Sequence, residues 1–184
     1  HNQEHPRFFF LTGFMASGKS TLGHLAVHGT EIRFLDLDQL LEKETQLAVS
    51  EIFSQRGEEF FREIEAQCLR KLTMLPEPQY VIACGGGTPH FHDNLQWMKK
   101  NGVVIFIDPP IDIIINRLDE SRSGRPLAAH FDDKSWKKEL IQLWEERRAR
   151  YLEADIVLDD ADPENILNSL QGIIQERGIT NKEI

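Results

Sequence analysis

The chain is poor in cysteine, has no excess of positive charge and contains no long hydrophobic run. Its two cysteines, Cys68 and Cys84, cannot build a disulfide framework, which is typical of a reduced, cytoplasmic protein. The formal net charge of −9 argues against nucleic-acid or anionic-membrane partners, because both favour a basic surface. No apolar run approaches the roughly 20 residues that cross a bilayer, and His1–His5 lacks the features of a signal peptide. We therefore expect a cytoplasmic protein without such partners.

The 184 residues suit one domain, which we place at residues 6–178, with tails at 1–5 and 179–184. Short, continuous apolar runs alternate with segments of helical periodicity, a pattern typical of strands buried on both faces of a parallel sheet. It predicts an α/β fold, a doubly wound five-stranded parallel sheet flanked by helices, with ligands at the carboxyl ends of the strands. The predicted strands are Arg7–Gly13, Ile32–Asp38, Tyr80–Gly86, Val103–Asp108 and Ile156–Asp159. The predicted helices are Lys19–His28, Glu58–Leu72, Asn94–Lys100, Ile111–Leu118, Ser135–Tyr151 and one that begins after Asp162-Pro163.

A phosphate-binding motif follows the first predicted strand. Residues Gly13–Ser20 match G-x-x-x-x-G-K-[ST] and precede a predicted helix, as a P-loop requires. The backbone N–H groups of such a loop cradle phosphates, Lys19 reaches the β- and γ-phosphate oxygens, and the Ser20 hydroxyl is placed to bind Mg²⁺. The ATP-binding residues expected from this loop are Ala16, Ser17, Gly18, Lys19, Ser20 and Thr21.

The motif identifies a nucleoside triphosphate but not a reaction. A GTPase-type switch needs an Asp-x-x-Gly sequence, and none occurs in the chain. The last four residues, Asn181–Ile184, begin like the guanine-binding Asn-Lys-x-Asp motif but lack its aspartate. These observations argue against the switch.

Four features could form the site of a phosphate acceptor. Asp36 and Asp38 end the second predicted strand, and both point to one side of it. They could bind Mg²⁺ and an acceptor hydroxyl, or they could be there simply because the chain turns. Arg62 and Glu65 lie three residues apart on a predicted helix, close enough to pair, as surface decoration or as an anion clamp. The other two features follow later in the chain.

Gly85, Gly86 and Gly87 come after the third predicted strand, as a tight turn or as the place where a ligand approaches the backbone. Arg147 interrupts an apolar helical stripe, and it either snorkels outward, which the sequence alone slightly favours, or points into a cleft. Residues 119–133 are polar and too long for an ordinary loop, which favours a mobile lid over a plain surface loop.

The order and spacing of these elements resemble the shikimate kinase family from Phe8 to about Gln175. The resemblance rests on the P-loop with Met15, Asp36-x-Asp38, Gly57–Glu65, the three glycines, Arg125-Pro126-Leu127 in the lid, and Arg147 four residues before Tyr151. It implies a P-loop kinase of the nucleoside-monophosphate-kinase-like fold. Such a kinase transfers phosphate from ATP to the shikimate 3-hydroxyl with Mg²⁺, in aromatic amino-acid biosynthesis.

The resemblance also implies a division of labour. Lys19, Asp38 and Arg125 would be catalytic, Arg117 would flank the adenine, Arg125 would contact ATP from the lid, and Asp36 would hold Mg²⁺ through water. An acceptor-binding helical segment would span about residues 39–72, and we expect a monomer. The residues expected to bind shikimate are Asp38, Arg62, Glu65, Gly85, Gly86, Gly87 and Arg147.

The sequence departs from the family pattern in two places near ATP. Ala16 stands where the family usually has glycine, and the adenine loop at 159–163 is shorter than usual. Two alternatives remain open: a kinase for another acceptor such as gluconate or a nucleoside monophosphate, and a non-catalytic nucleotide-binding module. Intact Lys19, Ser20, Asp36 and Asp38 argue against the second.

Overall fold

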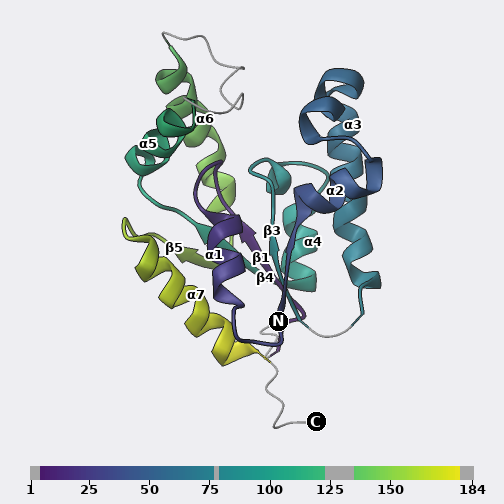
Figure 1. Ribbon diagram of the computed structural model, residues 1–184, viewed down its shortest axis with the longest axis vertical. Helices are drawn as coiled ribbons and strands as arrows, with labels where there is room; N and C mark the ends of the chain where they lie inside the picture. The colour runs from purple at the N-terminus through teal and green to yellow at the C-terminus, as the bar shows by residue number, and fades with distance from the viewer. Residues whose placement is uncertain (1–4, 77–78, 123–134, 179–184) are drawn as a thin grey trace.

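The computed structural model describes residues 5–76, 79–122 and 135–178. Five parallel strands form one sheet in the order β2-β3-β1-β4-β5 (Figure 1), so the predicted α/β architecture is confirmed. The central strand β1 (Phe8–Thr12) is buried along its whole length, as its continuous apolar sequence predicts. The other strands are β2 (Arg33–Asp36), β3 (Tyr80–Ala83), β4 (Gly102–Ile107) and β5 (Ile156–Leu158).

Helices cover both faces of the sheet. The helices are α1 (Lys19–Ala26), α2 (Leu37–Thr45), α3 (Val49–Lys71), α4 (Asn94–Asn101), α5 (Ile111–Arg122), α6 (Trp136–Tyr151) and α7 (Pro163–Arg177), with short 3₁₀ helices η1 (Leu72–Met74) and η2 (Thr88–His90). Phe9 and Leu11 pack on α1 and α7, whereas Phe8 and Phe10 face the core beneath α2, α3 and α4. This alternation follows from the two-residue period of a strand. Among the described residues, no helix combines the length and apolar character needed to cross a membrane.

The second strand ends earlier than predicted, and this moves one candidate residue. Strand β2 stops at Asp36, and Asp38 lies in the first turn of α2. The Asp36 carboxylate accepts hydrogen bonds from the backbone N–H groups of Asp38, at 2.9 Å, and Gln39, at 3.4 Å, and so caps the helix. The prediction that Asp36 and Asp38 share one side of a strand is therefore wrong.

Two helices are longer than predicted. Helix α3 begins at Val49 and is interrupted at Gly57, whose φ of +82° only glycine adopts readily. Helix α5 continues to Arg122, so residues 119–122 of the predicted lid are helical. The rest of that lid, with Arg125, lies outside the described residues. Figure 1 shows α5 and α6 on one side of the carboxyl end of the sheet and α2 and α3 on the other.

Candidate active site

The phosphate loop joins β1 to α1, and the Lys19 side chain hydrogen-bonds back to the backbone of the loop. The Lys19 ammonium donates hydrogen bonds to the backbone carbonyls of Gly13 and Phe14, both at 2.7 Å. A side chain at Gly13 would lie 2.5 Å from the carbonyl oxygen of Ile107, so the start of the loop must be glycine to pack against the end of β4. Burial lowers the pKa of Lys19 to about 8, an effect that the nearby carboxylates of Asp38 and Asp36 oppose.

Ala16 has a left-handed backbone with φ +57°. This conformation is unfavourable for a residue with a Cβ, which explains why glycine suits the position. Its carbonyl accepts a hydrogen bond from Arg117 Nη1 at 2.9 Å. The predicted adenine-flanking arginine thus lies against the phosphate loop.

Ser20 and Asp36 meet beside the loop. The Ser20 hydroxyl donates to Asp36 Oδ2 at 2.6 Å, while Asp36 Oδ1 caps α2. A hydroxyl and a carboxylate at this spacing suit Mg²⁺, which prefers oxygen ligands. Within 5–76, 79–122 and 135–178, no group of three or more acidic, histidine or cysteine side chains could hold a metal ion. A divalent cation here would therefore complete its coordination with water and phosphate oxygens.

A pocket of about 710 Å³ opens next to the phosphate loop, between α1 and the start of α7. Arg117 and the exposed side chain of Leu25 lie on its wall. Apolar groups beside a phosphate site are suited to a nucleotide base. Leu25 and Leu167 belong to no sequence motif, and only the folded arrangement of α1 and α7 brings them together. The lining residues are Ala16, Gly18, Thr21, Leu22, Leu25, Arg117, Pro163, Glu164 and Leu167.

The three glycines after β3 form a turn at which several charged side chains meet. A Cβ at Gly85 would lie 3.3 Å from both Asp38 Oδ1 and Glu65 Oε2. A Cβ at Gly86 would lie 3.6 Å from Arg147 Nη1, and one at Gly87 would lie 2.4 Å from Arg62 Nη2. Gly85 therefore faces two carboxylates, and Gly86 and Gly87 each face an arginine. The turn brings Asp38, Glu65, Arg62 and Arg147 together from α2, α3 and α6, and Gly86 also approaches the backbone of Met15 in the phosphate loop.

Arg62 and Glu65 form a buried pair rather than a surface one. Arg62 Nη1 lies 3.0 Å from Glu65 Oε1, and the relative exposures of the two residues are 7% and 0%. The other edge of the guanidinium, Nε and Nη2, donates to Glu58 Oε1 at 3.3 Å. Its plane stacks on the Phe91 ring with the guanidinium carbon 4.2 Å from the ring centroid. Glu65, Glu58, the Phe91 ring and the Gly87 backbone thus all restrict the orientation of Arg62.

Arg147 points into the site, so the snorkelling interpretation is wrong. Its guanidinium reaches Gly86 and is close enough to Lys19 to lower the pKa of that lysine. The end of α6 is tied to the same turn, because the Tyr151 hydroxyl donates to the Gly86 carbonyl and its ring stacks on Phe106. Burial raises the pKa of Tyr151 to about 12, which keeps this donor protonated.

Asp38 is a carboxyl group with a strongly raised pKa. Burial, then the negative charges of Asp36 and Glu65, raises its pKa to about 6. A carboxylate with this pKa is ionised at neutral pH and accepts a proton more readily than an ordinary aspartate. Its Oδ1 lies 3.3 Å from where a Cβ of Gly85 would be, and its charge acts on Lys19, so Asp38 is near both the glycine turn and the phosphate loop.

Comparisons with known proteins agree on one family. A family model described as shikimate kinase matches residues 15–177. The shikimate kinase of Persephonella marina is 35% identical over 171 residues, which cover 92% of this chain and 99% of the relative. The crystal structure of shikimate kinase from Bacteroides thetaiotaomicron aligns with a TM-score of 0.80 at 32% identity, over 91% of this chain and 96% of that chain. Shikimate kinase from Acinetobacter baumannii, solved in complex with shikimate, aligns with a TM-score of 0.78 at 27% identity, over 94% and 93%.

Proposed function

The chain belongs to the shikimate kinase family, enzymes that phosphorylate shikimate with ATP, and we propose which residues perform this reaction. The main support is the glycine turn, which brings Asp38, Arg62 and Arg147 to the phosphate loop. A hydroxylated carboxylic acid needs a cationic clamp and a hydroxyl acceptor next to a phosphate donor. These three side chains offer both.

On the phosphate side, residues 16–21 surround the β- and γ-phosphates of ATP, and Arg117 flanks the adenine in the 710 Å³ pocket. Lys19 exchanges the carbonyls of Gly13 and Phe14 for phosphate oxygens when ATP binds. Arg125 would add a cation from the lid, a role that the resemblance implies for a residue outside the described ones. Together these cations stabilise the charge on the transferred phosphoryl group.

Ser20 would bind Mg²⁺ directly and Asp36 would hold it through water, which their 2.6 Å contact supports. When bound there, Mg²⁺ would neutralise negative charge on the phosphate groups. Asp36 also caps α2, so its carboxylate is fixed before any ligand arrives.

On the acceptor side, Arg62 and Arg147 bind the carboxylate of shikimate, because two guanidinium forks can hold it through paired hydrogen bonds. Glu65 steadies Arg62, and backbone N–H groups of Gly85–Gly87 meet the hydroxyls. Asp38 orients the 3-hydroxyl. That oxygen attacks the γ-phosphorus, its proton passes to Asp38, and the bridging oxygen leaves with ADP.

An acceptor panel tests this assignment. ADP release should occur with shikimate and stay at the background level with gluconate, AMP or no acceptor. Turnover with gluconate or AMP would support the alternative kinase, and ATP binding without turnover would support a nucleotide-binding module. NMR of the product should place the phosphate on the 3-oxygen.

We also propose that the enzyme works as a cytoplasmic monomer with one kinase domain. All the groups named above come from one chain, so the site needs no second copy. The buried thiols of Cys68 and Cys84 suit a reducing compartment. Sedimentation at assay concentration should give a single species near the chain mass of 21.3 kDa.

A further inference from the structure

A buried hydrogen-bond path leads from the acceptor arginine to residues that no motif identifies. Glu65 is fully buried, and each of its carboxylate oxygens has one donor. Oε1 accepts from Arg62 Nη1 at 3.0 Å, and Oε2 accepts from the Thr88 hydroxyl at 2.7 Å. The position of the carboxylate therefore depends on Thr88 as much as on Arg62.

Thr88 is itself held by a buried amide. Asn94 Nδ2 donates to the Thr88 carbonyl at 2.9 Å, and both residues have 0% exposure. The Asn94 side-chain oxygen accepts from Arg70 Nη1. The Asn94 amide thus donates a hydrogen bond to the turn and accepts one from α3.

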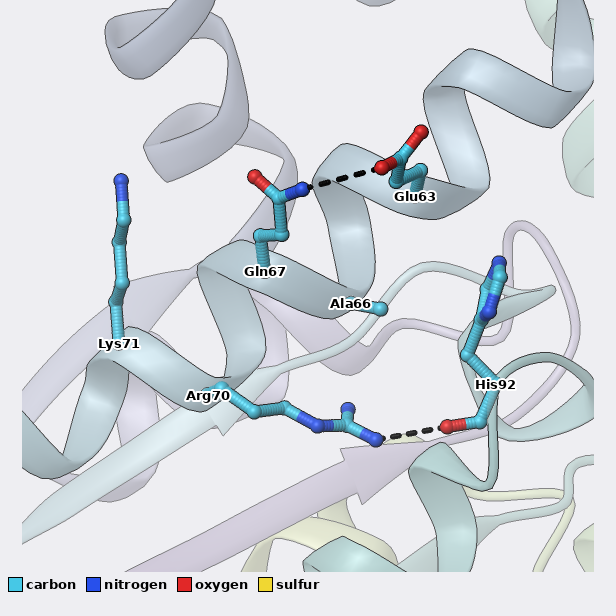
Figure 2. A pocket seen from close by; sticks show the side chains of 6 residues that line it. All are labelled: Glu63, Ala66, Gln67, Arg70, Lys71 and His92. Atoms are coloured by element: carbon cyan, nitrogen blue, oxygen red, sulfur yellow. Dashed lines mark hydrogen bonds between the residues drawn. The ribbon is translucent and has the colours of Figure 1, made fainter.

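Arg70 fastens the far end of this path. Figure 2 shows Arg70 reaching from α3 to the backbone of His92, where Nη2 donates to the carbonyl at 2.7 Å. Arg62, Glu65 and Arg70 all lie on α3, and Glu65 and Arg70 are separated by about 7.5 Å along the helix axis at 1.5 Å per residue. The segment Thr88–Asn94 is thus clamped to α3 at both ends.

The contacts that hold Thr88–Asn94 against α3 also affect the geometry of the acceptor site. Arg62 Nη2 lies 2.4 Å from where a Cβ of Gly87 would be, so the guanidinium rests on the backbone just before Thr88. A shift of Thr88 would move Glu65 and the glycine N–H groups together, and with them the fork of Arg62. Phe91, between Thr88 and Asn94, stacks on the same guanidinium.

We propose that Thr88 and Asn94 are positioning residues for recognition of the acceptor carboxylate, acting through Glu65 on Arg62. The proposal rests on the proposed function, because Arg62 matters only if it binds the acceptor. It gives roles to two uncharged residues that the site assignments above omit. Their loss should weaken acceptor binding selectively and leave ATP binding unchanged.

Thr88→Val removes the hydroxyl and keeps the shape. We expect KM for shikimate to rise about 10-fold, the equivalent of one hydrogen bond to a charged group, while KM for ATP stays unchanged. Thr88→Ser keeps the hydroxyl and should restore KM for shikimate. Asn94→Asp keeps the acceptor for Arg70 but loses the donor to Thr88, and should also raise KM for shikimate selectively.

Thr12→Val is the matched control, because Thr12 is also buried but its hydroxyl donates to the Ile105 carbonyl in the sheet, at 3.4 Å. Its KM for shikimate should not change, and thermal melts of all variants separate stability from binding. In a Glu65→Gln background, Thr88→Val should add little to the loss, since both act through one carboxylate.

Several outcomes would overturn the proposal. Equal losses for ATP and shikimate would reduce Thr88 to a structural role, as would failure of Thr88→Ser to recover. If the increases in KM for shikimate were additive in the double variant, Thr88 would act by a route other than Glu65. If the unmodified enzyme does not phosphorylate shikimate at all, the proposed function falls first, and the inference falls with it.

Discussion

The proposed phosphate side of the site comes mainly from one stretch of chain, Gly13–Ser20, whereas the proposed acceptor side draws Asp38, Arg62 and Arg147 from three helices. Backbone N–H groups do much of the binding in the loop, and their positions follow from local dihedral angles. On the acceptor side, the proposed binding groups are charged side chains, and neighbouring side chains hold them in place. Activity should therefore depend, on the phosphate side, on Lys19 and on the backbone conformation of the loop. On the acceptor side, binding should depend on the identity of each side chain.

Lys19→Ala should have the largest effect and should separate the two halves. The described residues of the loop offer no other cation to the β/γ bridge, so we expect kcat to fall on the order of 10³-fold. Calorimetry without nucleotide should show unchanged shikimate affinity, because the arginine clamp remains. Near-normal turnover would contradict the P-loop assignment, and loss of shikimate binding would mean that the halves are not independent.

Asp38→Asn should lower kcat by about 100-fold, since the hydroxyl loses its orienting carboxylate and proton acceptor. The raised pKa of Asp38, about 6, predicts that kcat/KM of the unmodified enzyme falls as the pH drops through 6. This fall of kcat/KM at acidic pH should be missing in the Asp38→Asn variant.

Asp36→Asn is the matched comparison: it should raise the Mg²⁺ concentration for half-maximal rate with little change in shikimate binding. Exchanged phenotypes would exchange the two roles.

The same substitution gives a stability test. A pKa raised from 3.8 to about 6 destabilises the folded state, because the unfolded chain loses the Asp38 proton at lower pH than the folded protein does; this cost builds up between about pH 4 and pH 6 and is complete above pH 6. Asp38→Asn should therefore increase the free energy of unfolding by about 3 kcal/mol at pH 8, and the gain should vanish below about pH 4, where the carboxyl is protonated in both states. Urea denaturation at the two pH values measures the difference.

Arg147→Lys tests whether side-chain identity governs the acceptor half. A lysine keeps the charge but loses the paired donors, so KM for shikimate should rise about 30-fold, equivalent to about 2 kcal/mol, at unchanged KM for ATP. An unchanged KM for shikimate would return Arg147 to a structural role despite its place beside Gly86.

Ala16→Gly should have the smallest effect and tests the backbone half. Relief of the left-handed strain slightly outweighs the added freedom of the unfolded chain, so we expect a gain of about 0.5–1 kcal/mol in unfolding free energy. Chemical denaturation measures it, with KM for ATP as the check on the loop. A loss of stability would mean that Ala16 makes packing contacts worth more than its strain.

The same contrast explains what the sequence could predict. A P-loop is a local pattern, and strands buried on both faces are continuous apolar runs, so both were recognisable without a structure. The position of Asp38 was predicted wrongly because the capping role of Asp36 starts a helix one residue after the strand. The sequence Asp-x-Asp-Gln followed by two leucines is typical of a helix start, but the apolar run just before it favours a continuing strand.

The acceptor half could be found by resemblance but not by its own pattern. The spacing of Arg62 and Glu65 is common on exposed helices, and only the packing of the glycine turn against α3 buries them. Thr88 and Asn94 give no sequence signal, because a threonine and an asparagine are usual at helix starts. Their importance follows from contacts between residues that are distant in the chain.

The place of β1 in the sheet has a consequence for how the protein is made. Although it is first in the chain, β1 lies between β3 and β4, and Phe8 pairs with Tyr80 on one side and Gly102 on the other. At about 5–20 residues per second, a ribosome needs several seconds after finishing β1 to deliver these partners. Closing such long loops is entropically costly and slows folding. The phosphate loop has a local sequence motif, but it must therefore wait, during synthesis, for most of the chain before it acquires its shape.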